Sequence, residues 1–236
     1  MLNAVRSGAA GALVCAAALS ILSAAPACAQ NVLDGLRRHP TLTSTITDNG
    51  DLNPYAVVVA PVTSGKIQKG DVLVDNFNNT SNLQGAGGTI IDFNPSTRST
   101  TLFAKLPQNL SQCPGGIGLT TAMTMLSSGW VIVGSTPSTD GTTATKGDGC
   151  LLVFDSNGRL ATIWSGSHIN GPWGNMAVID NGAKATLFVS MSGYDLPAPS
   201  QLDAATGVPV VINKATVLRI QLAIQPAARR RSPARR

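Results

Sequence analysis

The stretch Phe93-Asn-Pro-Ser-Thr-Arg-Ser-Thr-Thr-Leu-Phe103 recurs 61 residues later as Phe154-Asp-Ser-Asn-Gly-Arg-Leu-Ala-Thr-Ile-Trp164. Both copies keep Phe, Asn or Asp, Arg, Thr and a final aromatic residue at the same positions. Asn-Pro-Ser and Asp-Ser-Asn-Gly favour tight turns, and strand-forming residues flank them. Each stretch therefore predicts two antiparallel strands joined by a short turn, and their recurrence predicts an internal repeat.

More strand-like segments extend this repeat upstream. Apolar runs of strand length lie at 70–74, 129–133 and 185–189, and an earlier strand is expected before each, at 56–60, 119–126 and 175–179. A third copy of the next strand lies at 215–220. Each repeat thus reads strand a, strand b, long connection, strand c, short turn and strand d, with a period of roughly 55–62 residues. The long connections are predicted at 75–88, 134–149 and 190–214.

Four short antiparallel strands per repeat are typical of a β-propeller blade. One blade cannot bury both faces of its sheet, so blades stack around an axis. The predicted fold class is therefore all-β, a β-propeller of four-stranded antiparallel blades with about three blades present, at about 52–106, 115–166 and 171–224. A β-sandwich is the alternative, but a sandwich requires no such repeat.

A family resemblance supports this fold. The segments Asn53-Pro-Tyr-Ala-Val-Val-Val-Ala-Pro61, Gly70-Asp-Val-Leu-Val-Asp-Asn-Phe-Asn-Asn79 and Asn82-Leu-Gln-Gly85 resemble the NHL-repeat type of bacterial secreted β-propeller. The resemblance covers about residues 50–222, although Ala56 replaces the family's usual Gly, which Gly118 and Gly174 keep in the later repeats. It implies a ring that commonly has six blades.

Only about three blades are visible in this sequence. The segment Leu42-Thr-Ser-Thr-Ile-Thr47 has the character of an outer strand that would close a last, missing blade. Open sheet edges invite further pairing. The chain is therefore expected either to self-associate and complete the ring or to be a truncated, non-functional fragment of a larger propeller.

The first residues predict export. Arg6, an apolar run over about 9–25 and Ala27-Cys-Ala29 form a secretory signal peptide at 1–29, so the propeller would occupy 30–226 of a secreted or periplasmic protein. A membrane anchor and a lipoprotein signal at Cys28 are the alternatives. An exported protein with a cleaved signal would have no further membrane attachment.

Charge separates the tail from the body. Six of the 17 basic residues lie in the signal peptide or at 229–236, and the remaining 11 nearly balance the 12 acidic residues. A body without a basic stripe argues against nucleic acid as a partner. Residues 227–236 are expected to form a disordered basic tail.

Two cysteines remain after removal of the signal peptide. In an oxidising compartment, a single pair favours one disulfide, here between Cys113 and Cys150, over a metal site or a catalytic thiol.

Candidate binding residues lie on the face that carries the b-to-c connections, because long loops on a rigid scaffold often bind ligands. They are Asn53, Tyr55, Asn76, Asn78, His168, Asn170, Trp173, Asn175, Tyr194 and Asp195. Tyr55 and Trp173 occupy equivalent repeat positions and are candidates to stack on a ligand ring, the alternative being that they fill the core between blades.

No motif identifies a reaction. Residues 75–79 offer oxygen ligands of the kind Ca²⁺ prefers, but such a cluster also serves an ordinary turn, so no cofactor is assigned. His168 lacks the nucleophile elbow of a hydrolase. A lactonase-like propeller enzyme would use a metal-binding Glu, and the chain contains none. The favoured function is a non-catalytic binding or scaffolding module for a protein, glycan or small ligand, and the alternative is a metal-assisted hydrolase.

Overall fold

A computed structural model describes residues 40–107, 109–142, 145–166, 168–193 and 216–224. Its contacts divide the chain into two compact units, Met1–Thr41 and Leu42–Arg236. Everything that follows concerns the second unit. The predicted signal peptide and basic tail lie outside the described residues and stay predictions.

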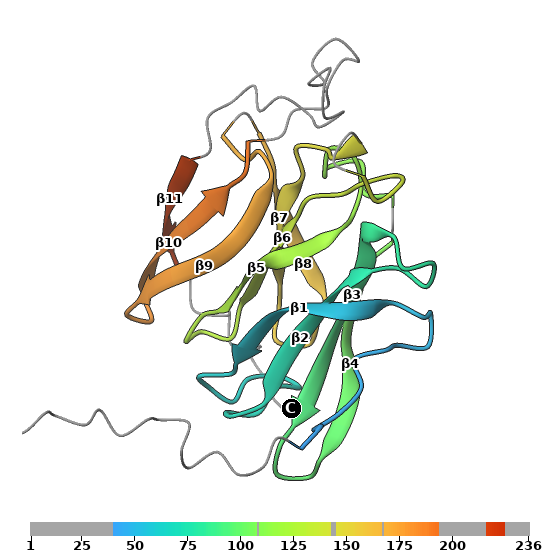
Figure 1. The fold of residues 1–236 in the computed structure, drawn as a ribbon. Coiled ribbons are helices and arrows are strands. Elements are labelled where there is room, and N and C mark those ends of the chain that lie inside the picture. Colours follow the sequence, from blue (N-terminus) through green and yellow to red (C-terminus); the bar gives the residue numbers. More distant parts are fainter. Residues whose placement is uncertain (1–39, 108, 143–144, 167, 194–215, 225–236) are drawn as a thin grey trace, which may run out of the picture. The chain divides into compact units, whose positions relative to one another are not determined.

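The described part of the chain contains eleven strands in three antiparallel sheets (Figure 1). Sheet 1 consists of β1 (Leu52–Val59), β2 (Val72–Asn78), β3 (Gln84–Asn94) and β4 (Ser99–Lys105), in that order. Sheet 2 consists of β5 (Leu119–Met125), β6 (Val131–Ser135), β7 (Cys150–Phe154) and β8 (Leu160–Trp164). Sheet 3 has β9 (Pro172–Asp180), β10 (Lys184–Met191) and β11 (Thr216–Ala223). Each sheet falls within one of the three predicted repeats.

Local turn chemistry explains the two hairpins of the repeated stretch. The Asn94 side-chain oxygen accepts hydrogen bonds from the backbone N–H groups of Ser96 and Thr97. In the second copy, Asp155 accepts from the N–H groups of Asn157 and Arg159 in the same way. An Asn or Asp at the start of a turn thereby replaces strand pairing with side-chain hydrogen bonds, which reverses the chain.

The all-β prediction is confirmed at the level of antiparallel sheets of three or four strands. The described sheets do not close into a ring, so the propeller itself stays a prediction. One connection differs from the prediction: 75–88 was expected to be a long loop, yet β2 continues to Asn78 and β3 begins at Gln84. The polar residues of this stretch are buried between elements, and this tertiary environment overrides their weak strand propensity.

Sheet 2 is buried on both faces. Its residues alternate between two cores, so that Val131 and Val133 pack towards sheet 1 while Ile132 packs towards sheet 3. The first core also includes Leu73 and Ile90 of sheet 1, and the second includes Leu187 of sheet 3. A strand that is buried on both faces needs a continuous apolar run, which explains the apolar sequences of β6 and β7.

A disulfide joins Cys113, which precedes sheet 2, to Cys150 at the start of β7, with a Cα–Cα distance of 5.2 Å. This is the pair proposed from the sequence. Both cysteines are buried in the core between sheets 1 and 2.

The segment Leu42–Thr47 forms no strand ladder in the structure. It lies along sheet 1, where the Thr45 carbonyl accepts a hydrogen bond from the Asn76 side chain (2.7 Å) and the Thr47 hydroxyl lies 3.3 Å from that of Thr89. Within the described residues, no helix is long and apolar enough to cross a membrane.

Candidate functional site

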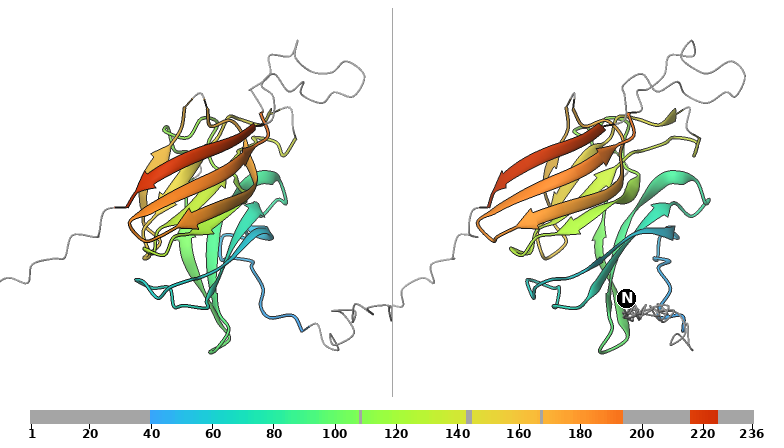
Figure 2. Two further views of the ribbon diagram at one scale, coloured as in Figure 1. Left: turned by 90° about the vertical axis from the view of Figure 1, so that its left-hand side faces the viewer. Right: turned by 60° about the vertical axis from the view of Figure 1, so that its left-hand side comes forward.

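The first strands of the three sheets, β1, β5 and β9, lie side by side and begin at the same end of the fold (Figures 1 and 2). The β2–β3 and β6–β7 connections reach the same end, because Leu52 pairs with Asn78 and Leu119 with Ser135. We call this end, where the aromatic residues described next also lie, the aromatic end.

Three aromatic rings pack together at the aromatic end. Tyr55 of β1 stacks on Phe77 of β2, with ring centroids 4.1 Å apart and an angle of 21° between the rings. Trp173 of β9 meets both rings edge-on, 6.3 Å from Tyr55 and 5.1 Å from Phe77. Phe77 is fully buried, whereas Tyr55 and Trp173 are each half-buried. This aromatic cluster of Tyr55, Phe77 and Trp173 joins the first sheet to the third.

Lys146 lies against the aromatic cluster. Its Nζ is 4.5 Å from the centre of the Trp173 ring and 4.9 Å from that of Phe77, both within the range of a cation–π contact. The side chain is only 3% exposed, and its ammonium has no hydrogen-bond partner among the described residues. Burial lowers the pKa of Lys146 to about 8, because the charged form loses its hydration.

The backbone leaves room for this ammonium. A Cβ on Gly85, at φ 72°, would lie 2.8 Å from the Lys146 Nζ. Lys146 itself is held by a β-bridge to Ser138 within the β6–β7 connection, and the next residue, Gly147, donates a backbone hydrogen bond to the Pro137 carbonyl. These contacts fix the backbone from which the Lys146 side chain reaches the aromatic cluster.

Beside the cluster, three asparagines form a hydrogen-bonded chain. The Asn53 amide donates to the Asn78 side-chain oxygen at 3.1 Å, and the Asn78 amide donates to that of Asn82 at 2.6 Å. Asn53 and Asn82 both have a positive φ, a conformation that Asn tolerates better than most residues. Asn53 and Asn78 therefore hold the ends of β1 and β2 together, next to Tyr55 and Phe77.

The calcium site that the sequence offered as an alternative at residues 75–79 stays a prediction, and in the structure Asp75 and Asn76 have different surroundings. Consecutive residues of a strand point to opposite faces. Asp75 faces sheet 2 and accepts a hydrogen bond from the Ala56 N–H at 2.8 Å, whereas Asn76 faces away and contacts Thr45 and Thr89. Their oxygens therefore do not converge on one ion. In the described ranges, no group of three His, Cys or Asp residues could hold a metal.

Asp75 is nevertheless unusual chemically. It is fully buried, and its Oδ2 has no hydrogen-bond partner in the described part of the chain. Burial raises the pKa of Asp75 to about 8, although hydrogen bonds from the Ala56 and Tyr55 backbone oppose the shift. The carboxyl group is therefore mostly protonated at neutral pH.

Of the other predicted residues, Asn175, His168 and Asn170 are described and lie outside the aromatic cluster. Asn175 is exposed on β9, two residues after Trp173, where the pairing of β9 with β10 is irregular. His168 is exposed after β8, and Asn170 is buried just before β9, where its carbonyl accepts a hydrogen bond from the Gly193 N–H. Tyr194 and Asp195 lie outside the described residues. The structure thus unites Tyr55 and Trp173, with Asn53 and Asn175 in the same strands and Asn78 beside Phe77 at the end of β2.

Sequence reasoning missed Phe77 and Lys146. Phe77 was read as part of a polar loop, and a lysine inside a Gly- and Thr-rich connection gave no sign that it would be buried. The period-two pattern Leu73, Asp75, Phe77 could have placed Phe77 on the inner face of a longer β2.

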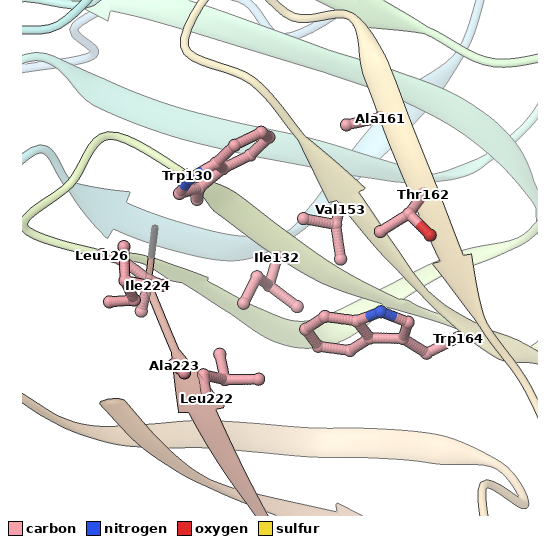
Figure 3. Close-up of a pocket in the computed structure, with 10 residues that line it drawn as sticks. All are labelled: Leu126, Trp130, Ile132, Val153, Ala161, Thr162, Trp164, Leu222, Ala223 and Ile224. Carbon is pink, nitrogen blue, oxygen red and sulfur yellow. The ribbon is translucent and has the colours of Figure 1, made fainter. Parts of the chain in front are cut away.

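A second feature is an apolar cleft between sheets 2 and 3, with a volume of about 290 Å³. Trp130, just before β6, and Trp164 of β8 line one side of it, and Leu222 and Ile224 line its opposite side at the end of β11 (Figure 3). A neighbouring cleft of about 390 Å³ shares Trp164 and includes the exposed His168. These clefts run along the inner face of β11.

No protein-family model matches this chain, and comparison with curated proteins finds no match. Its function must therefore be argued from its own residues.

Proposed function

We propose that the chain is an exported β-propeller binding module that recognises a glycan at the aromatic end, and that it catalyses no reaction there. In this proposal the three sheets are propeller blades. The observation that carries it is the pair of half-buried rings, Tyr55 and Trp173, fixed from behind by Phe77 and Lys146.

The support is the fixed position of these two rings. Phe77 and Lys146 are buried, so Tyr55 and Trp173 rest on groups that cannot move into solvent. Aromatic side chains give a large contact area at a low cost in conformational entropy, and that cost is lowest when the rings are already held in place.

The neighbouring polar groups favour a sugar over a purely apolar ligand. Asn53 and Asn175 flank the two rings along their strands and supply amide donors and acceptors, which suit hydroxyl groups. Aromatic rings that offer an apolar face beside such groups match a ligand with an apolar ring face and a hydroxylated rim. The partner is therefore expected to be an oligosaccharide with exposed pyranose faces.

The test is binding of the exported protein to an array of soluble oligosaccharides, followed by affinity measurements on the best ligand. Asn175→Ala removes an exposed amide beside Trp173 and should weaken binding at least about tenfold. His168→Ala, an exposed change away from the aromatic end, is the matched control and should leave the affinity unchanged.

Two results would refute the proposal. One is a folded wild-type protein that binds no glycan on the array. The other is a bound glycan whose affinity falls with His168→Ala but not with Asn175→Ala, because the ligand would then occupy the cleft beside Trp164.

A further inference from the structure

The free edge of β11 is the starting observation. Sheets 1 and 2 have four strands each, whereas sheet 3 has three in the described residues, and β11 pairs only with β10 (Figure 2). The apolar clefts run along the same strand, against Leu218, Ile220 and Leu222. A fourth strand at this edge would place its inner side chains in those clefts. Residues 225–236, which follow β11, contain no large apolar side chain that could fill them.

The order of strands along the chain indicates which segment could serve as a fourth strand. The fourth strand of sheet 1, β4, is followed by β5, the first strand of sheet 2, and β8 is followed by β9 in the same way. A segment that precedes a first strand is therefore the fourth strand of the preceding sheet. Leu42–Thr47 precedes β1, and within the described residues, which start at residue 40, no sheet precedes sheet 1.

The contacts of Leu42–Thr47 fit that role. Its threonines face sheet 1, where Thr43 and Thr47 lie beside Thr100 of β4 and Thr89 of β3. Leu42 and Ile46 point the other way and are 64% and 65% exposed. The segment thus already lies on the outer face of sheet 1, as the last strand of a preceding sheet would, with its apolar side chains directed outward.

The exposed aliphatic side chains lie on matching surfaces. Seven large hydrophobic residues of the described chain are exposed: Leu42, Ile46, Val57, Val59, Leu102, Ile179 and Val217. Val57, Val59 and Leu102 lie on the face of sheet 1 that points away from sheet 2, because they pair with Val74, Val72 and Ile91. Ile179 and Val217 lie on the face of sheet 3 opposite its buried Leu187. An unpartnered apolar surface of this kind marks an interface.

We propose that two copies of this chain form a closed ring of six sheets, in which Leu42–Thr47 of each copy is the fourth strand of sheet 3 of the other. The segment pairs with the free edge of β11, and Leu42 and Ile46 enter the clefts beside Trp164. The outer face of sheet 1 then covers the outer face of sheet 3 of the partner. Sheet 1 of each copy meets sheet 3 of the other, so the same contact forms twice. Two copies therefore complete the ring, and no sheet edge between them is left unpaired.

The cleft has the right size for this occupant. An apolar cavity of about 150 Å³ holds a benzene-sized group. The cleft between Trp130, Trp164 and Leu222 measures about 290 Å³, which is room for two aliphatic side chains. The exchange also requires no rearrangement of the segment, because its threonines keep their contacts with sheet 1.

The test is the molar mass of the protein in solution, measured by light scattering after the whole chain is expressed and recovered from the periplasm. The wild type should have twice the mass of one processed chain at micromolar concentration. Leu42→Asp with Ile46→Asp places two carboxylates in the apolar cleft and should weaken association at least about a hundredfold, to a folded monomer. Both positions are exposed in the single chain, so the change should not prevent folding.

Asn157→Asp, an exposed change in the β7–β8 turn, is the matched control and should remain dimeric. Three results would overturn the proposal: a wild type that is monomeric at 100 µM, an open-ended series of larger assemblies, or a dimer that the double aspartate variant leaves intact. A folding defect in that variant would be visible by circular dichroism, and Ile179→Asp on the opposite surface would then provide the second test.

Discussion

Replacing the buried carboxyl group of Asp75 by an amide should change how the stability of the fold depends on pH. Burial raises the pKa of Asp75 from 3.8 to about 8 in the folded protein. The folded state therefore binds a proton that the unfolded state has already released above about pH 4. Stability is lost as pH rises between these two values, and it is lost at up to about 1.4 kcal/mol per pH unit.

Between pH 5 and pH 8 this loss amounts to about 4 kcal/mol for the wild type. Asn has nearly the same shape as a protonated Asp, keeps an oxygen for the Ala56 N–H, and does not titrate. Asp75→Asn should therefore gain about 4 kcal/mol relative to the wild type between pH 5 and pH 8. If the amide itself destabilises the fold by a constant amount, the free energy of unfolding falls equally at pH 5 and at pH 8. That amount therefore cancels in the comparison.

The assay is urea unfolding of both proteins at several pH values, with the difference in free energy plotted against pH. Asp140→Asn is the control. Asp140 is exposed, and its pKa is lowered to about 2, chiefly by a hydrogen bond from the Thr145 side chain, so it stays ionised over this range. The difference in unfolding free energy between Asp140→Asn and the wild type should therefore not change with pH. A difference for Asp75→Asn that changes by less than about 1 kcal/mol would refute the conclusion that this carboxyl is buried with its Oδ2 unpaired among the described residues.

Three further predictions concern the aromatic end and the disulfide. Lys146→Met should raise the melting temperature relative to the wild type more at pH 7 than at pH 10, because burial disfavours the charged amine; an equal effect at both pH values would mean that the amine is solvated. Gly85→Ala should destabilise the fold by about 1–2 kcal/mol in urea unfolding, because its φ is positive and its Cβ would meet Lys146; a neutral result would contradict that contact. Replacing both Cys113 and Cys150 by Ala should cost about 4 kcal/mol by the loop-entropy relation for their separation of 37 residues, and unchanged stability on chemical unfolding would show that the bond is not formed.

The sequence was most informative where structure is determined locally. Turn chemistry at Asn94 and Asp155 and apolar runs of strand length identified the hairpins and the repeat. Local signals suffice for these elements because each depends on residues close in the chain. The repeat placed Tyr55 and Trp173 at equivalent positions on one face, but not their contact with each other.

The sequence was least informative where burial is imposed by distant elements. Residues 75–78 are polar except for Phe77 and were expected to form a loop, but they continue β2 because sheet 2 and Leu42–Thr47 cover its two faces. The burial of Lys146 depends on rings contributed by β2 and β9, which no pattern near Lys146 reveals. Of the residues that form the candidate site, the sequence therefore predicted Tyr55 and Trp173 but not Phe77 or Lys146.

Hydrogen exchange at Leu42–Thr47 and β11 tests the strand exchange most directly. The backbone amides of Leu42–Thr47, and those amides of β11 that point away from β10, should be protected in concentrated protein. Both sets should lose that protection together on dilution below the dissociation constant. Amides of Leu42–Thr47 that exchange freely at every concentration, in a protein whose β10 amides stay protected, would contradict the pairing of this segment with the partner's β11.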